Sequence, residues 1–238
     1  GYNKYFGRMD FLINWANNGE ELKKFAQKKY GTITRTIVGM EHFFKEGITY
    51  SLITSENRFS ARYLPKGWIF TNAGSCIFPN DYSEQYYLLA LVNSKVANYL
   101  LYCLNPTVNF EIGDINSLPV VDVSDEDKIK CTNFVMKIIE NKKKLYKCYD
   151  VLSELYDDDS CVKEICSVYK EGMSFYEVYK CIFIKKSELE IQNEEYSFIL
   201  DEYLFKLYKI SVEDKKRILN KFGVSPISYV LINKHFIE

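Results

Sequence analysis

Proline and glycine divide this sequence into two unlike parts that meet near Val121. Turn-forming residues recur throughout the first part, whereas the second part contains no proline before Pro226. Proline is tolerated poorly inside helices and central strands, so the first part should consist of short elements joined by turns. The second part can form long helices. We therefore expect an α+β fold, with an α/β region of short strands over residues 1–121 and a mainly helical region over residues 122–238.

Six short β-favouring runs lie between the turns of the first part and are predicted to form strands. They are Thr32–Val38, Ile48–Ile53, Phe59–Tyr63, Trp68–Thr71, Cys76–Phe78 and Ser117–Val121. Helices should interrupt these strands. One is expected over residues 20–28, a second over 84–92 with Ser83 as its N-cap, and a third from the N-cap Ser94 to about Leu104.

Beyond Val121 the helix signals are serine caps, acidic first turns and apolar stripes. Ser124 with Asp127 forms a capping-box-like start, and Ser211 with Asp214 forms another whose helix should end at Gly223. Further helices are predicted over residues 161–171 and 174–184, followed by a longer one. Its apolar stripe consists of Tyr196, Ile199, Leu200, Tyr203 and Leu207. Such a stripe usually indicates mutual packing of helices.

The net charge of −1 conceals an uneven distribution along the chain. Residues 1–66 carry 11 Lys/Arg against 6 Asp/Glu, residues 67–121 carry 1 against 4, and residues 122–238 carry 19 against 22. The three parts therefore contribute +5, −3 and −3. A basic front on an acidic body is typical of a surface that faces a polyanion, although exposed lysines also serve solubility alone.

Hydrophobicity and cysteine usage indicate a soluble protein in a reducing compartment. No apolar run reaches the roughly 18 residues that a bilayer span requires, and no charged-then-apolar leader is present, so no membrane partner is expected. The seven cysteines show no CxxC spacing, and the chain has two histidines. This irregular, odd-numbered set favours reduced thiols over a disulfide framework or a zinc site.

Basic, aromatic and small polar residues are concentrated between Glu41 and Pro79. Arg58, Arg62 and Lys66 fall within nine residues, and Phe59, Tyr63 and Trp68 are interleaved with them. Arginine can bind phosphate or the edge of guanine, and small polar side chains can reach bases or backbone. The stretch therefore favours nucleic-acid binding. Its alternative is ordinary β-rich globular structure, for which short aromatic runs are also typical.

The sequence offers little catalytic chemistry. It lacks GxGxxG, GxxxxGK, HExxH and GxSxG. The run Asn105-Pro106-Thr107-Val108 departs from the Asn-Pro-Pro-aromatic loop that holds an extruded adenine, because it has neither the second proline nor the aromatic. Asp114 with Glu126-Asp127-Lys128 could form a nuclease metal site, but acids are expected in a first helical turn anyway. We expect no catalytic residue, metal ligand or cofactor-binding residue in this chain.

Two segments carry a resemblance to a known family. These are FKEGITYSLITSENRFSARYLPKGWIFTNAGS, residues 44–75, and LLALVNSKVANYLLYCLNPTVNFEIGDINSLP, residues 88–119. In their order of KEGIT, FSARY, AGS, an LNS-like VNS, PT-x-N-aromatic and a closing Leu-Pro, they resemble the C-terminal region of BREX phage-defence adenine-specific DNA methyltransferases, the PglX family. Two further segments, WANNGEELKKF and ILDEYLFKLYKIS, resemble the same family more weakly.

The resemblance implies a target recognition domain, which reads the DNA sequence while a separate module methylates adenine at N6. That module and its S-adenosylmethionine would lie ahead of Gly1, so the chain itself would not be an enzyme although its parent would. The implied partners are double-stranded DNA and the parent's own N-terminal methyltransferase module, in the bacterial cytoplasm. The alternative is a protein-interaction platform that holds other phage-defence proteins, and the nuclease is the third reading.

Ten residues are candidates for DNA binding under this interpretation. Lys45, Arg58, Arg62 and Lys66 are expected to contact phosphate or guanine. Candidates for finer readout are Thr49, Ser55, Asn57, Ser60, Asn72 and Ser75. Each could instead be a solvated charge or a polar group that stabilises a turn.

Overall fold

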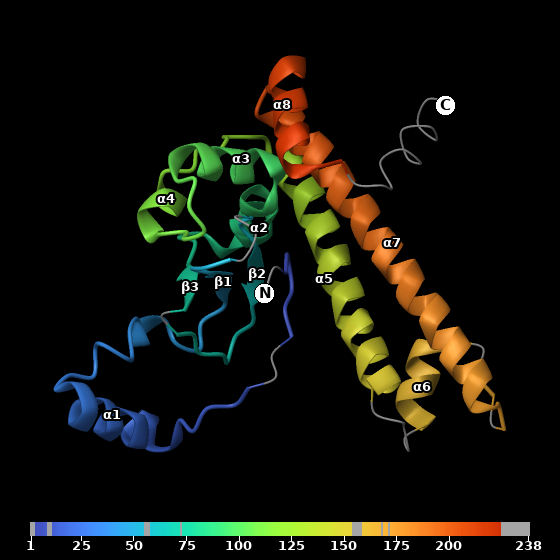
Figure 1. Ribbon diagram of the computed structural model, residues 1–238, viewed down its shortest axis with the longest axis horizontal. Helices are drawn as coiled ribbons and strands as arrows, with labels where there is room; N and C mark the ends of the chain where they lie inside the picture. The colour runs from blue at the N-terminus through green and yellow to red at the C-terminus, as the bar shows by residue number, and fades with distance from the viewer. Residues whose placement is uncertain are drawn as a thin grey trace. The chain divides into compact units, whose positions relative to one another are not determined.

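The computed structural model describes residues 3–8, 11–54, 58–71, 73–153, 159–167, 169–170 and 172–224. It has the expected α+β fold, with one small antiparallel sheet and a mainly helical C-terminal part (Figure 1). Two compact units are present. The first comprises Gly1–Asn93 and Leu100–Val120, and the second comprises Ser94–Tyr99 and Val121–Glu238.

The sheet of the first unit has three strands in the order β2-β1-β3. They are β1 (Gly47–Ser51), β2 (Ala61–Leu64) and β3 (Gly74–Ile77), and both pairings are antiparallel. Ile48 and Tyr50 of the central strand are buried. Three of the six predicted strands are thus confirmed with shifted ends.

The other three runs, Thr32–Val38, Trp68–Thr71 and Ser117–Val121, are not strands, and their prediction was wrong. Backbone hydrogen bonds explain two of them. The Ile37 N–H donates to the Ile33 carbonyl, which closes a turn, and the Trp68 carbonyl accepts from the Phe44 N–H outside any ladder. Strand propensity depends on an available neighbouring strand, which these runs lack.

The first unit also contains helices. They are α1 (Ala16–Tyr30), α2 (Gln85–Asn93), α4 (Ile112–Asn116) and the second half of α3 (Lys95–Leu104), whose residues up to Tyr99 belong to the second unit, with 3₁₀ turns η1 (Met40–His42) and η2 (Tyr82–Glu84). Ser94 caps α3 as expected, because its Oγ accepts from the Ala97 N–H at 3.0 Å. Ser83 is not a cap. Its N–H instead donates to Asp81 Oδ1 at 2.8 Å. Asp81 is therefore the N-cap of η2, which precedes α2.

Asn93, at the end of α2, ties that helix to the edge strand β2. Its Oδ1 accepts from the Ala61 N–H at 2.9 Å, and its Nδ2 donates to the Ala61 carbonyl at 2.9 Å and to the Leu89 carbonyl at 3.0 Å. The side chain is fully buried. One amide therefore satisfies both backbone groups that Ala61 turns away from the central strand.

The second unit is built on two long helices that run side by side, α5 (Asp125–Ser153) and α7 (Phe175–Leu207) (Figure 1). They are antiparallel, because Asp127 bonds Tyr203 near one end and Tyr149 bonds Glu190 towards the other. Between them lies α6 (Asp159–Ile165), and α8 (Val212–Phe222) follows.

The local helix signals of this unit are largely confirmed. Ser124, Ser174 and Ser211 each accept a hydrogen bond from the backbone three residues later, and Gly223 ends α8. The two helices expected after residue 174 are instead the single helix α7. No glycine or proline interrupts residues 175–207, and surface pairs such as Lys186 with Glu190 support the continuous helix.

Lys95 ties the first turn of α3 to α7 within the second unit. Its N–H donates to Asp201 Oδ1 at 2.8 Å, and its ammonium lies 2.7 Å from Asp201 Oδ2. Both side chains are largely buried. A carboxylate at the N-terminus of α3 also complements the helix dipole.

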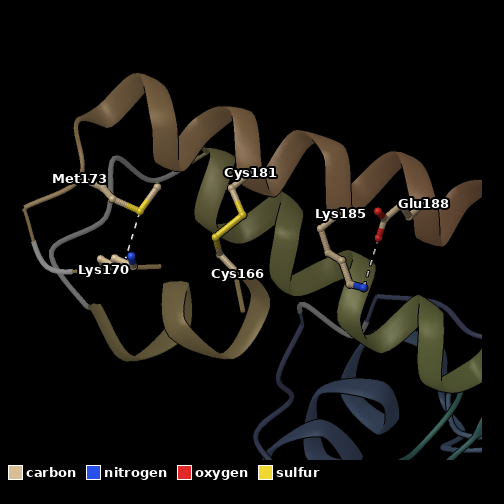
Figure 2. The surroundings of a disulfide bond; sticks show 6 residues. All are labelled: Cys166, Lys170, Met173, Cys181, Lys185 and Glu188. Atoms are coloured by element: carbon tan, nitrogen blue, oxygen red, sulfur yellow. Dashed lines mark hydrogen bonds and ion pairs between the residues drawn. A yellow bond between two sulfur atoms is a disulfide. The ribbon is translucent and has the colours of Figure 1, made fainter. Parts of the chain in front are cut away.

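A disulfide joins Cys166 to Cys181, so the expectation of reduced thiols was wrong for this pair. Figure 2 shows Cys166, just beyond α6, facing Cys181 on α7. The chain reverses between these helices and brings two residues separated by 15 positions to a Cα–Cα distance of 6.1 Å, which suits a disulfide. Such a reversal leaves no spacing motif in the sequence. Cys76, Cys103, Cys131 and Cys148 are free thiols.

Among the described residues, no single helix is long and apolar enough to cross a membrane. By length and composition alone, one pair of segments, Tyr82–Asn93 and Lys95–Leu104, meets that requirement together, with a bend of 65° between them.

Candidate nucleic-acid interface

A row of side chains crosses one face of the sheet. Thr49 on β1 pairs with Arg62 on β2 and with Cys76 on β3. Residues directly opposite in a ladder project to the same side, so these three share a face. The neighbouring row, which contains Tyr50 and Ser75, projects to the other side, where Tyr50 is buried.

Arg62 is held in place by two features of its surroundings. Its Nη2 donates to Ser51 Oγ at 2.9 Å, two residues along β1 from Thr49. The Arg62 stem lies against Gly7, where a Cβ would approach Arg62 Cδ to 2.8 Å. A methyl group at position 7 would therefore displace the stem. Fixed stems and oriented guanidinium groups reduce the entropy lost on binding an anion.

A cavity of about 510 Å³, here called the sheet-face cavity, opens over this row. Its lining includes Asn3, Gly7, Arg8, Thr49, Arg62 and Thr71. Arg8 is exposed and Arg62 is half-buried, and both arginines line this one cavity. Arginine is a side chain that commonly binds phosphate oxygens, and hydroxyl and amide groups commonly hydrogen-bond to ligands.

The structure separates the candidate residues into several groups. Lys45 and Lys66 are both exposed, on loops joined by hydrogen bonds from the Phe44 N–H to the Trp68 carbonyl and from the Gly67 N–H to the Phe44 carbonyl. Arg58 is half-buried. Ser55, Asn57 and Asn72 lie outside the described residues.

Three polar candidates are engaged by the protein itself. Ser60 is 1% exposed, and its Oγ accepts from the Asn3 N–H at 3.3 Å. The Thr49 hydroxyl donates to the Ser75 carbonyl at 3.2 Å. Ser75 lies on the opposite sheet face, where it hydrogen-bonds Tyr50. On β3 the residue that shares the face of Arg62 is Cys76, whose pKa is raised to about 11 by burial despite the nearby Arg62 charge.

Sequence reasoning missed Arg8, Asn3 and Thr71. Arg8 belongs to the basic front, but only the parallel bridge between Tyr5 and Arg62 brings its segment beside β2. Thr71 lies on a run that was expected to be a strand. No local pattern in the sequence indicates that any of the three lines a cavity with Arg62.

The PT-x-N loop has a structural role in the first unit. Asn105 Nδ2 donates to Asp114 Oδ2 at 2.9 Å, and Asn105 Oδ1 accepts from the Thr107 N–H at 3.1 Å. Asn109 forms a bridge with Ile53 beside the sheet. Bonds from the Thr54 N–H to the Val108 carbonyl and from the Phe110 N–H to the Leu52 carbonyl join the loop to residues 52–54.

The acids considered for a nuclease are engaged at helix ends. Asp114 accepts from the Glu111 N–H as part of the cap of α4. Asp127 accepts from Ser124 and Tyr203, and both bonds lower its pKa, while Glu126 pairs with Lys130 at 2.8 Å. Within the part of the chain that the structure describes, no group of three or more His, Cys, Asp or Glu residues could hold a metal ion.

Comparison with known proteins gives two partial matches. The chain is 34% identical over 131 residues to the adenine-specific methyltransferase PglX of Lacticaseibacillus casei (strain Zhang), which covers 55% of this chain and 11% of the relative. It is 36% identical over 120 residues to the adenine-specific methyltransferase BrxX of Escherichia coli O9:H4 (strain HS), covering 50% and 9%. This chain is related to adenine-specific methyltransferases over about half of its length.

The matched stretch spans only about a tenth of each relative. No protein-family model matches the chain. The partial identity to PglX and BrxX agrees with the family resemblance that the ordered sequence phrases indicate.

Proposed function

We propose that this chain is the DNA sequence-recognition region of an adenine-specific (N6) DNA methyltransferase that acts in phage defence. The names of PglX and BrxX support the methyltransferase part of the proposal. The catalytic module and its S-adenosylmethionine belong, in this proposal, to another part of the parent protein. The partners of this chain are that module and double-stranded DNA.

One observation carries the recognition role, namely the convergence of Arg8 and Arg62 on the sheet-face cavity. Arg62 is held by Ser51 and Gly7, so it can present a fixed guanidinium to a guanine edge or a phosphate. The exposed Lys45 and Lys66 are suited to phosphate contacts, which position a protein on DNA without reading its sequence. Arg58 remains a candidate for either contact.

The proposal is tested with the longest protein that contains this chain. Arg62→Ala and Arg8→Ala are compared with Arg35→Ala, a matched control whose guanidinium lies over Tyr30 in the same unit and outside the cavity lining. Binding of duplex DNA that carries the methylated site is measured across a range of salt concentrations, and the methylated sequence is read from treated DNA.

Each cavity variant should weaken binding about tenfold and lower the salt slope by about one unit, while the control changes neither. Arg62→Lys keeps the charge but loses the planar fork, so it separates phosphate binding from base reading. If binding shows no steep salt dependence, and both cavity variants leave affinity and methylated sequence unchanged, the recognition role is wrong.

A further inference from the structure

A second cavity, of about 520 Å³, lies in the first unit and is lined mainly by apolar side chains, six of which are aromatic. Trp15, Phe43, Phe44, Trp68 and Phe70 contribute to this aromatic cavity. The rings of Trp15 and Phe43, and those of Phe43 and Phe70, meet edge to face with centroids 5.2 Å apart. Edge-to-face packing is a favoured arrangement of aromatic pairs, so the walls are supported by one another.

The lining of the aromatic cavity includes apolar side chains that are exposed to solvent. Phe11 and Leu12 line the cavity and are 91% and 95% exposed. Exposed apolar residues around an apolar hollow are typical of a ligand site. The volume lies in the range of small-molecule pockets and is large enough for one aromatic ring system.

The two cavities of this unit share a wall. Phe11 and the segment Trp68–Thr71 line both the aromatic cavity and the sheet-face cavity, where Arg8 and Arg62 lie. A ligand that occupies both must be anionic at one side and flat and apolar at the other. A nucleic-acid strand with one base turned out of its stack has this chemistry, whereas an apolar peptide segment does not use the arginines.

We propose that the aromatic cavity holds one unstacked base of the DNA whose phosphates lie against Arg8 and Arg62. This inference rests on the proposed function, because it assigns the same ligand to the adjoining cavity. Enzymes that modify a base take it out of the duplex, which leaves bases unpaired near the site. Stacking on the cavity rings would offset part of that cost, and the Thr36 and Thr71 hydroxyls could bond the edge of the base.

The chain contains its own reporter of occupancy. Trp15 and Trp68 are its two tryptophans, and both line the aromatic cavity. The probes are a short oligodeoxyadenylate and an abasic strand with the same number of phosphates. Binding is followed by the anisotropy of dye-labelled strands, and occupancy of the cavity by tryptophan fluorescence with unlabelled strands. Both strands should bind with salt dependence, but only the strand that has bases should quench the tryptophans.

Variants of the exposed wall test the site without removing buried structure. Phe44→Ala and Phe11→Ala should each weaken oligodeoxyadenylate about tenfold and leave the abasic strand unchanged. Phe25→Ala is the matched control, because Phe25 is an exposed phenylalanine of α1 that does not line the cavity. It should change neither strand.

The outcomes separate this inference from the proposed function. If oligodeoxyadenylate binds with salt dependence but leaves the tryptophans unquenched, or if Phe44→Ala weakens both strands equally, the base site is wrong and DNA recognition stands. If neither strand nor duplex binds at low salt, both proposals fail. Quenching by a phenylalanine-containing peptide, with none by the strand, would assign the cavity to a protein partner and overturn the base site.

Discussion

The buried amide of Asn93 offers a sharp test of how the sheet edge is held. Asn93→Ala removes three hydrogen bonds, two to Ala61 and one to Leu89. The Ala61 carbonyl keeps its bond from the Tyr5 N–H at 2.7 Å, so the heaviest loss falls on the buried Ala61 N–H. An unsatisfied buried donor costs about 1–3 kcal/mol, and each ordinary hydrogen bond contributes about 1 kcal/mol. The free energy of unfolding should therefore fall by about 2–4 kcal/mol.

Asn93→Asp distinguishes the hydrogen bonds from the volume of the side chain. The aspartate can still accept from the Ala61 N–H, but an ionised carboxylate cannot donate to the Ala61 and Leu89 carbonyls and places its charge against them. We expect a loss at neutral pH at least as large as that of the alanine variant. Part of it should be recovered in acid, where the protonated carboxyl can donate one bond.

Urea unfolding followed by circular dichroism measures these changes, and hydrogen exchange at the Ala61 amide reports them locally. Asn141→Ala is the control, because its amide makes one solvent-exposed bond to Gln192 at 3.2 Å. That variant should lie within about 0.5 kcal/mol of the wild type. If Asn93→Ala does so too, and Ala61 exchanges no faster, the amide does not hold β2 and the reasoning is refuted.

Sulfur chemistry and one buried ion pair give three further tests. Cys166→Ser opens a loop with a sequence separation of 15 and should lower the free energy of unfolding by about 3 kcal/mol without reductant, but by much less in excess dithiothreitol; equal losses would contradict this. Burial raises the pKa of Cys76 and Cys131 from 9.0 to about 11. Because these thiols lose their protons at lower pH in the unfolded state than in the folded state, the free energy of unfolding, measured in urea, should fall between about pH 9 and 11. The fall should shrink when both thiols become serine, and an unchanged slope would exclude them as its cause. Asp201→Ala leaves the largely buried Lys95 ammonium without its carboxylate and should lower the free energy of unfolding in urea by about 3 kcal/mol. A loss below about 1 kcal/mol would show that the pair behaves as an exposed one.

Local chemistry explains what could be predicted from the sequence. Ser94, Ser124 and Ser211 start helices because the cap and its partner lie within three residues of each other. The same reasoning failed at Ser83, because Asp81, two residues earlier, caps this turn by accepting from the Ser83 N–H.

Register explains what could not be predicted in the candidate interface. Side chains alternate between the faces of a strand, so a shift of one residue exchanges Ser75 for Cys76 on the face of Arg62. Amino-acid composition does not determine this register, and so it does not determine which of the two residues faces the same side as Arg62. Nor could it show that Arg8 and Thr49 line the same cavity, because this depends on a pairing between distant segments. The position of Arg62 depends on the same kind of non-local contact.

The close approach of Gly7 to Arg62 has an evolutionary consequence. A side chain at position 7 is compatible only with a shorter residue at position 62 or with a different course of its stem. Substitutions at the two positions should therefore arise together among relatives. If Arg62 reads DNA, relatives that methylate different sequences should differ at position 62. They should then also differ in the residue at position 7, although a glycine there touches no base.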